Sequence, residues 1–216
     1  MGSKKYWEEK LKVYASKDWG DKPTIFAAQI TGYLPKKGKL LELGAGNGQD
    51  SLYFSRQGYE VTSTDLIGTA LVTAKRKAGE EGLGINFQEI DTSKPLPFND
   101  ESFDIVYSHL ALHYLDKAGT EKLFLEIYRV LKAGGIMASI FNTAEDPEPH
   151  CAEFEKVEEN YYRKISANFC KRYFSIEETE CFINGLFEPL LLDNKGQSYN
   201  KSQVNNLIRL VGKKKG

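Results

Sequence analysis

The sequence of 216 residues has little of what marks secreted or membrane-bound proteins. Its three cysteines, Cys151, Cys170 and Cys181, are far apart and odd in number, which argues against a disulfide framework and against a thiolate metal site. No apolar run is long enough to cross a membrane, and the first residues lead into no signal-peptide core. We therefore expect a cytoplasmic protein with reduced cysteines, no metal and no membrane contact.

An excess of charge of one sign is also missing. The formal net charge is −1, and the Lys213–Lys215 run is interpreted as a solvated tail. A nucleic acid is therefore not expected as a partner. The hydrophobic content of 41% and the charged content of 27% are ordinary for a globular protein. The length suits a single α/β domain over residues 1–216.

Short apolar segments alternate with segments of helical periodicity between residues 39 and 141. This alternation predicts a parallel sheet with helices on both faces. Near the end of the chain, residues 187–192 and 204–211 are expected to form an antiparallel pair that closes the sheet. The expected strands of the alternating part are 39–43, 59–64, 85–90, 103–107 and 136–141, and its expected helices are 48–57, 69–81 and 117–131.

Two segments lie outside this alternation. Residues 1–34 are expected to form an N-terminal helical segment, with Trp7, Leu11 and Tyr14 on one helix face. That face could pack on the edge of the core or could cover a pocket as a lid. Residues 143–174 are expected to form a helical insertion on the substrate side of the domain.

A glycine-rich loop, residues 44–48, follows the expected strand 39–43. Glycine adopts positive φ and lets a ligand approach the backbone, and the next helix begins there with its positive dipole end. A P-loop would end in Gly-Lys-Ser/Thr, and a dinucleotide-binding loop would need glycine where Gln49 stands. Glu42 and Asp50 flank the loop, and their charges favour a ligand that carries positive charge.

Polar residues also follow the ends of the neighbouring strands. A carboxylate at Asp65 can accept hydrogen bonds from two ribose hydroxyls, and Asp91 can receive the exocyclic amine of an adenine. The carboxyl ends of parallel strands meet at one edge of a sheet. We therefore expect one site along that edge. Besides the glycine loop, its residues are Asp65, Leu66, Asp91, Thr92, Ser108 and His109.

Taken together, these stretches resemble class I S-adenosylmethionine-dependent methyltransferases. Residues 42–48, Glu-Leu-Gly-Ala-Gly-Asn-Gly, match the acid-x-Gly-x-Gly-x-Gly motif of that family. Asp65 matches its ribose-binding acid, and Asp91 matches its adenine-side acid. Residues 129–135, Arg-Val-Leu-Lys-Ala-Gly-Gly, resemble the turn before its fifth strand, with alanine where proline is usual. Residues 46–52 are more weakly similar to the branch with tellurite-resistance and thiopurine-type enzymes.

The resemblance implies a Rossmann-like fold with a mostly parallel seven-stranded sheet, helices on both faces and an antiparallel C-terminal strand. It also implies in-line transfer of a methyl group from S-adenosyl-L-methionine to a small-molecule nucleophile. The cofactor-binding residues that it indicates are Glu42, Gly44, Ala45, Gly46, Gly48, Asp65, Leu66, Asp91, Thr92, Ser108 and His109.

Candidates for a general base and for acceptor contacts are less well defined. His109 and His113 are candidate catalytic residues, needed if the nucleophile arrives protonated. Aromatic and cationic side chains in the two outer segments would suit a planar or anionic acceptor. These candidates are Tyr6, Trp7, Tyr14, Tyr162, Arg163 and Arg172.

Two alternatives stay open at this point. One is a nicotinamide-dependent oxidoreductase on a similar sheet, against which Gln49, Glu42 and Asp91 argue. The other is a non-catalytic module that binds S-adenosylmethionine, which the sequence does not exclude.

Overall fold

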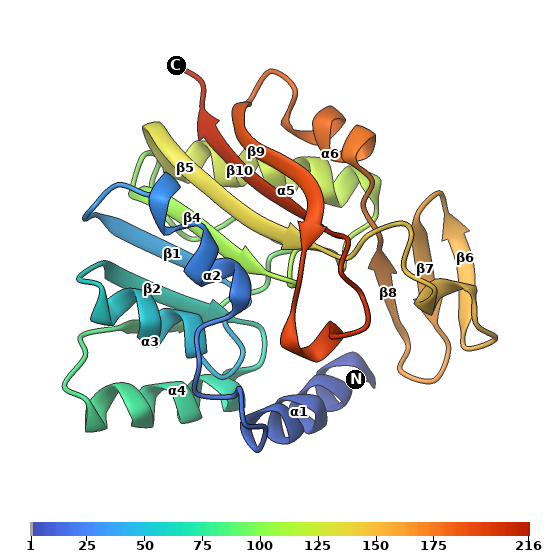
Figure 1. The fold of residues 1–216 in the computed structure, drawn as a ribbon, viewed down its shortest axis with the longest axis horizontal. Coiled ribbons are helices and arrows are strands. Elements are labelled where there is room, and N and C mark those ends of the chain that lie inside the picture. The colour runs from blue at the N-terminus through green and yellow to red at the C-terminus, as the bar shows by residue number, and fades with distance from the viewer. Residues whose placement is uncertain (1) are drawn as a thin grey trace.

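A computed structural model of the chain, which describes residues 2–216, has a seven-stranded sheet at its centre (Figure 1). The strand order is β3-β2-β1-β4-β5-β10-β9. The first five strands of that order run parallel, and β10 pairs antiparallel with both β5 and β9. The strands are β1 (Lys39–Leu43), β2 (Glu60–Asp65), β3 (Asn86–Glu89), β4 (Phe103–His109), β5 (Leu131–Phe141), β9 (Phe187–Gly196) and β10 (Leu207–Lys214). The predicted parallel sheet and its antiparallel closing pair are confirmed.

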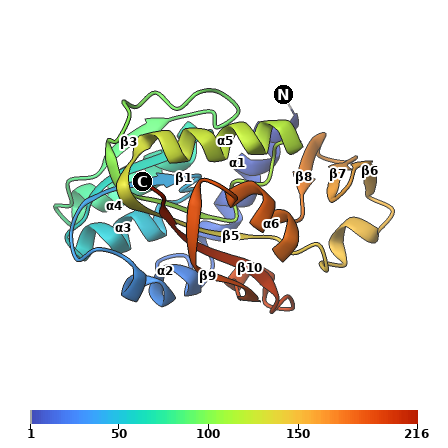
Figure 2. The ribbon, with the colours of Figure 1, turned by 90° about the horizontal axis from the view of Figure 1, so that it is seen from above.

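Helices cover both faces of this sheet (Figure 2). Phe26 and Phe54 pack with one set of strand residues, whereas Phe124 and Phe182 pack with the opposite set. These two apolar layers fix the sheet between the helices, and the ends of its strands support the site described below. The helices are α1 (Gly2–Ala15), α2 (Ile25–Gln29), α3 (Gln49–Arg56), α4 (Gly68–Glu80), α5 (Lys117–Val130) and α6 (Ile176–Ile183), with short 3₁₀ turns η1 (Thr31–Tyr33), η2 (Glu148–His150) and η3 (Tyr199–Lys201).

The expected helical character of residues 143–174 is wrong. After η2 this segment forms an antiparallel sheet of β6 (Phe154–Glu158), β7 (Tyr161–Lys164) and β8 (Phe169–Arg172). Asn160 and Asn168 have φ of +56° and +50°, the left-handed conformation that asparagine tolerates in tight turns. These turns separate short runs rich in aromatic and β-branched residues, which favour strands.

Three segments beyond the sheet meet at the carboxyl ends of its parallel strands. Figure 1 shows α1, β8 and the loop between β9 and β10 gathered at that side of the molecule. The backbone N–H of Arg172 donates to the carbonyl of His113 at 2.7 Å, so the small sheet is joined to the chain that follows β4. No helix among residues 2–216 is both long and apolar enough to cross a membrane.

Candidate active site

A cavity of about 470 Å³ lies where the glycine loop, the ends of β2 and β4, and these three segments meet. Its size is within the usual range for small-molecule sites. The structure brings together several residues that the sequence predicted for one edge of the sheet. The predicted cofactor residues that line the cavity are Glu42, Gly44, Ala45, Gly46, Asp65, Leu66, Asp91, Thr92 and His109.

At two positions of the loop, neighbouring side chains come so close that only glycine fits. Gly44 has φ of +76°, and a Cβ built on it would lie 2.1 Å from the Cβ of Ala111. Gly46 has φ of +54°, and its Cβ would lie 3.0 Å from Cδ2 of Leu11 on α1. Gly48 has another role: it does not line the cavity, and its Cβ would meet Ala74 of α4 at 2.4 Å. Gly48 therefore lets α3 and α4 pack closely.

Asp65, at the end of β2, holds the loop in place. Its Oδ2 accepts a hydrogen bond from the N–H of Gly46 at 2.7 Å, and its Oδ1 accepts one from the N–H of Ile67 at 2.8 Å. Burial raises the pKa of Asp65, and these two backbone hydrogen bonds oppose the rise. Each carboxylate oxygen can accept a further hydrogen bond, so Asp65 can still receive two hydroxyl groups from the cavity.

Two buried carboxyl groups lie near the start of α3. Glu42 is 2% exposed and accepts a hydrogen bond from the hydroxyl of Ser51. Asp50 is 1% exposed and accepts hydrogen bonds from Thr24 and from the hydroxyl of Tyr107, the latter at 2.6 Å. Burial and the charge of Asp50 raise the pKa of Glu42 well above its usual value. A positively charged ligand group beside this pair would favour ionisation of both.

A polar turn and an apolar wall form the other end of the cavity. Oδ1 of Asp91 accepts hydrogen bonds from the N–H of Ser93 at 3.0 Å and from its hydroxyl at 2.6 Å. Burial alone would raise the pKa of Asp91, but the hydrogen bonds from Ser93 hold it below its usual value. Leu110 has φ of +52°, and this strained conformation for leucine is typical of functional sites. The apolar lining here consists of Leu66, Ile67, Ile90, Leu110 and Leu115.

The two candidate histidines have different surroundings. His109 lines the cavity, and its Nε2 is buried with no hydrogen-bond partner among the described residues. Burial lowers the pKa of His109 to about 4, so its ring is neutral at neutral pH. His113 does not line the cavity; it is 1% exposed, and its Nδ1 lies 3.2 Å from Nδ2 of Asn142. His109 alone of the two is placed to contact a ligand.

Ser108, predicted beside His109, also lies outside the cavity lining. Its hydroxyl donates to the carbonyl of Leu43 at 2.8 Å and is buried between β4 and β1. The structure therefore gives Ser108 a contact that ties two strands together at the point where both approach the site.

Only Trp7 and Tyr14 of the predicted acceptor contacts line the cavity. Arg172 is 1% exposed and forms ion pairs with Glu158 and Glu178, and Arg163 pairs with Glu155 away from the cavity. The lining contains no Lys or Arg among the side chains that the structure describes. The expected cationic lining is therefore wrong. The predicted contacts that lie outside the lining are Tyr6, Tyr162, Arg163 and Arg172.

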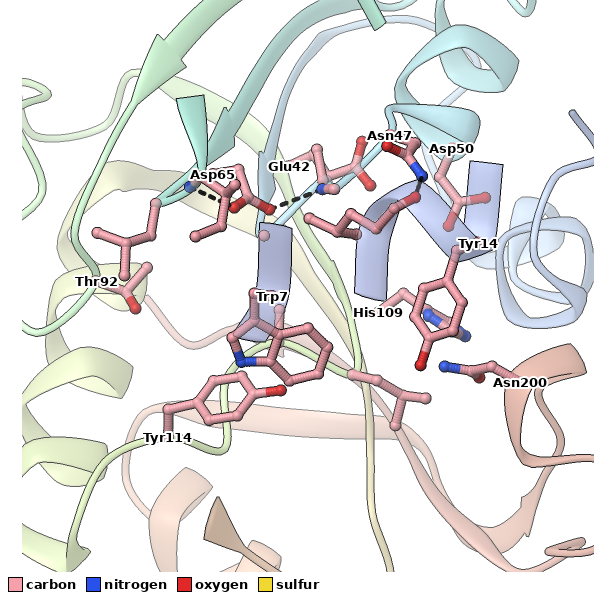
Figure 3. Close-up of a pocket in the computed structure, with 18 of the residues that line it drawn as sticks. Trp7, Tyr14, Glu42, Asn47, Asp50, Asp65, Thr92, His109, Tyr114 and Asn200 are labelled. Carbon is pink, nitrogen blue, oxygen red and sulfur yellow. Dashed lines mark hydrogen bonds between the residues drawn. The ribbon is translucent and has the colours of Figure 1, made fainter. Parts of the chain in front are cut away.

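Helix α1 lies across the cavity (Figure 3). Nδ2 of Asn47 donates to the carbonyl of Leu11 at 2.8 Å and thereby links the glycine loop to α1. The ring of Trp7 lies 5.6 Å from that of Tyr114 and 6.0 Å from that of Phe169, centre to centre. The N-terminal helix therefore forms one wall of the site.

Several lining residues were not predicted as site residues. The loop between β9 and β10 contributes Ser198, Tyr199 and Asn200, and nothing in the sequence pattern places this loop near the glycine loop. Phe169 lies on β8, whereas the sequence predicts helical character for residues 143–174. The other lining residues missed by the prediction include Leu11, Trp19, Asn47, Tyr114, Leu115, Asn168 and Cys170.

The chain is similar in sequence to known methyltransferases. Residues 41–139 match the family model described as a methyltransferase domain. Demethylmenaquinone methyltransferase of Thermus thermophilus is 32% identical over 154 residues, which are 67% of each chain. Malonyl-[acyl-carrier protein] O-methyltransferase of Enterobacter lignolyticus is 30% identical over 150 residues, 68% of this chain and 53% of that one.

Solved structures share the fold at lower sequence identity. The 1,6-didemethyltoxoflavin-N1-methyltransferase of Burkholderia thailandensis, solved with S-adenosylhomocysteine and 1,6-didemethyltoxoflavin, superimposes with a TM-score of 0.75. It is 16% identical, and the match covers 98% of this chain and 85% of that chain. The PH0226 protein of Pyrococcus horikoshii has a TM-score of 0.71 at 23% identity, with 87% of each chain covered.

Proposed function

We propose that the chain, which belongs to the S-adenosylmethionine-dependent methyltransferases, methylates a small molecule and that its residues have the following roles. The rim formed by the glycine loop, Asp65 and Asp91 binds the cofactor. The part of the cavity between α1, β8 and the β9–β10 loop binds the methyl acceptor. The oxidoreductase and the non-catalytic module are not favoured, because the relatives are named methyltransferases.

The residues of the rim fit this cofactor. Asp65 offers one free lone pair on each oxygen to the ribose hydroxyls, while Asp91 and Thr92 border the apolar slot that suits a flat base. The buried carboxyl groups of Glu42 and Asp50 favour positive charge beside the loop. When bound, the cofactor supplies an electrophilic methyl group on a positively charged sulfur.

His109 is the residue that we assign to the acceptor's nucleophile. Its neutral ring lines the cavity, and Nε2 can accept a hydrogen bond or a proton from that nucleophile. The rest of the site acts through enclosure and alignment, which bring the two reacting molecules together in a fixed orientation.

In this proposal α1, the first helix of the N-terminal segment 1–34, acts as a lid. Lys4 of α1 pairs with Glu89 at 2.8 Å, and Asp21 pairs with Lys77 on α4. The exposed fractions of the Lys4 and Glu89 side chains are 47% and 52%, and such exposed ion pairs contribute little stability. Movement of α1 would release these pairs and its contacts with Asn47, Tyr114 and Phe169, while the start of α2 stays in place. A covered cavity of this size also favours a small molecule over a nucleic acid.

The observation that carries this proposal is that one cavity is lined both by a glycine loop bound to Asp65 and by His109, whose Nε2 has no hydrogen-bond partner among the described residues. Calorimetry with S-adenosylhomocysteine and with NAD tests the cofactor, and binding of NAD alone would contradict the proposal. Transfer of a labelled methyl group to a panel of thiols, phenols, amines and carboxylates then tests the acceptor. The cytoplasmic location expected from the sequence stays a prediction.

A further inference from the structure

The acceptor part of the cavity has polar groups but no charged side chain. All four carboxyl groups of the lining, on Glu42, Asp50, Asp65 and Asp91, belong to the cofactor rim. We call a set of aromatic and uncharged polar lining residues the acceptor wall. They are Trp7, Tyr14, Trp19, His109, Tyr114, Asn168, Phe169, Cys170, Ser198, Tyr199 and Asn200.

An anionic group on the acceptor would have no partner at this wall. Lys171 on β8 and Lys201 in the β9–β10 loop do not line the cavity, and neither do the lysines of α1, which are Lys4, Lys5, Lys10 and Lys12. Nζ of Lys171 contacts Glu148 at 2.8 Å, and Nζ of Lys201 contacts Asp146 at 2.6 Å and Glu148 at 2.7 Å. A buried anion without a partner, close to four carboxyl groups, is strongly disfavoured.

Aromatic rings form most of the acceptor wall, in two groups. Trp7, Tyr114 and Phe169 have ring centres 5.6 to 6.0 Å apart. On the other side, Trp19 stacks on Tyr199 with ring centres 6.1 Å apart and planes at 14°. Such rings bury large areas and pair best with another flat ring.

Polar atoms converge at one place on this wall. In Figure 3 the side chains of Tyr14, His109 and Asn200 point toward one another across the cavity. The ring of His109 lines the cavity, whereas its Nε2 is covered by protein atoms and has no hydrogen-bond partner among the described residues. A small movement of the ring or its neighbours would open Nε2 to the cavity, where a ligand that donates a hydrogen bond would satisfy it.

On the basis of the function proposed above, we propose that the acceptor is an uncharged aromatic or heteroaromatic molecule whose O–H or N–H nucleophile donates a hydrogen bond to Nε2 of His109. Tyr14 and Asn200 contact the same polar group, and the two ring groups hold its flat faces. The wall discriminates against acceptors that carry a carboxylate or a phosphate.

Three naphthalene probes test this proposal by calorimetry at pH 7, with the protein saturated with S-adenosylhomocysteine. They are 2-naphthol, 2-naphthoate and naphthalene, which share the ring and differ in charge and in the hydroxyl. We expect 2-naphthol to bind at least about tenfold more tightly than 2-naphthoate. Equal or tighter binding of 2-naphthoate, or no binding of 2-naphthol, overturns the proposal. Failure of S-adenosylhomocysteine to bind in the first titration would instead overturn the proposed function.

Variants of two residues identify the atom responsible. His109→Leu is expected to remove the preference for 2-naphthol over naphthalene, because the accepting nitrogen is gone. His109→Gln, whose side-chain oxygen can accept a hydrogen bond, is expected to keep part of that preference. Arg163→Ala, which removes a cation that does not line the cavity, serves as the control and is expected to leave all three affinities unchanged. A preference that survives in His109→Leu would overturn the role assigned to Nε2.

Discussion

Asp50 accepts hydrogen bonds from both the backbone N–H of Thr24, at 2.7 Å, and its hydroxyl, at 2.8 Å. Thr24 is also the N-cap of α2, and Asp50 lies in the first turn of α3. This pair therefore attaches the chain between α1 and α2 to the helix that follows the glycine loop. Residues before Thr24 can move without disturbing that attachment.

The first prediction concerns this movement of α1. We expect S-adenosylhomocysteine to slow trypsin cleavage at Lys10, Lys12 and Lys17, because a filled cavity gives α1 more to pack on. Asn47→Ala should speed cleavage without ligand, since it removes the 2.8 Å hydrogen bond to Leu11. Asn194→Ala, at an exposed position of β9, is the control. Equal cleavage rates with and without S-adenosylhomocysteine would refute the lid.

The second prediction concerns Asp65. Asp65→Ala should weaken binding of S-adenosylhomocysteine roughly 10- to 100-fold, because the N–H of Gly46 and the ligand hydroxyls lose their acceptor. Calorimetry measures the affinity directly. Asp100→Ala removes a carboxylate whose side chain is 75% exposed and should change nothing. An unchanged affinity in Asp65→Ala would mean that the ribose binds elsewhere.

The third prediction compares two glycines. Gly44→Ala should destabilise the protein strongly, because its Cβ would overlap Ala111 and its φ is positive. Gly79→Ala, in α4, meets no atom within 4 Å and should stabilise the protein by about 0.5–1 kcal/mol. Thermal unfolding of both variants measures whether Gly44→Ala lowers the stability and Gly79→Ala raises it. A Gly44→Ala protein as stable as the parent would contradict the close packing at this loop.

The fourth prediction concerns pH and Glu148. Burial alone would raise the pKa of Glu148, but the charges of Lys171 and Lys201 hold it at about 2, below the ordinary value of 4.5. Because the folded pKa is the lower one, Glu148 contributes stability that is complete above pH 4.5 and is lost as the pH falls toward 2. Glu148→Gln should therefore lower the free energy of unfolding at pH 7 by about 1–3 kcal/mol.

Urea unfolding at a series of pH values measures this effect. The difference between Glu148→Gln and the parent should shrink as the pH falls below 4.5. Glu155→Gln is the control. It breaks the exposed ion pair between Glu155 on β6 and Arg163 on β7, and it should have little effect at any pH. A difference for Glu148→Gln that is equal at pH 7 and at low pH would exclude the linkage.

The cofactor rim could be predicted from the sequence because strand periodicity fixes which residues meet at a sheet edge. Asp65 and Asp91 were found in this way, since Asp65 ends β2 and Asp91 comes two residues after the end of β3. Gly48 and Ser108 were misjudged because a residue next to a site can face the core instead, which periodicity at a strand end does not resolve. The same holds on α4, where Val72 is 67% exposed although its neighbour Leu71 is buried.

The acceptor wall was harder to predict because long-range contacts form it. The positive charge of Arg172 suggested a ligand contact, yet Glu158 and Glu178 neutralise it in the interior. The loop with Ser198 and Asn200 reaches the cavity only through the pairing of β9 with β10. Charge and aromatic content alone give no information on such pairings.

The ion cluster at Lys201 has a consequence for altering selectivity by directed evolution. Lys201 connects the β9–β10 loop with Asp146 and Glu148, which belong to a segment far away in the sequence. Libraries that randomise residues 198–201 alone would break this connection, and many members would misfold before any gain could be screened. Libraries that vary residues 146–148 together with 198–201 contain combinations that restore charge balance, while the cofactor rim is inherited unchanged.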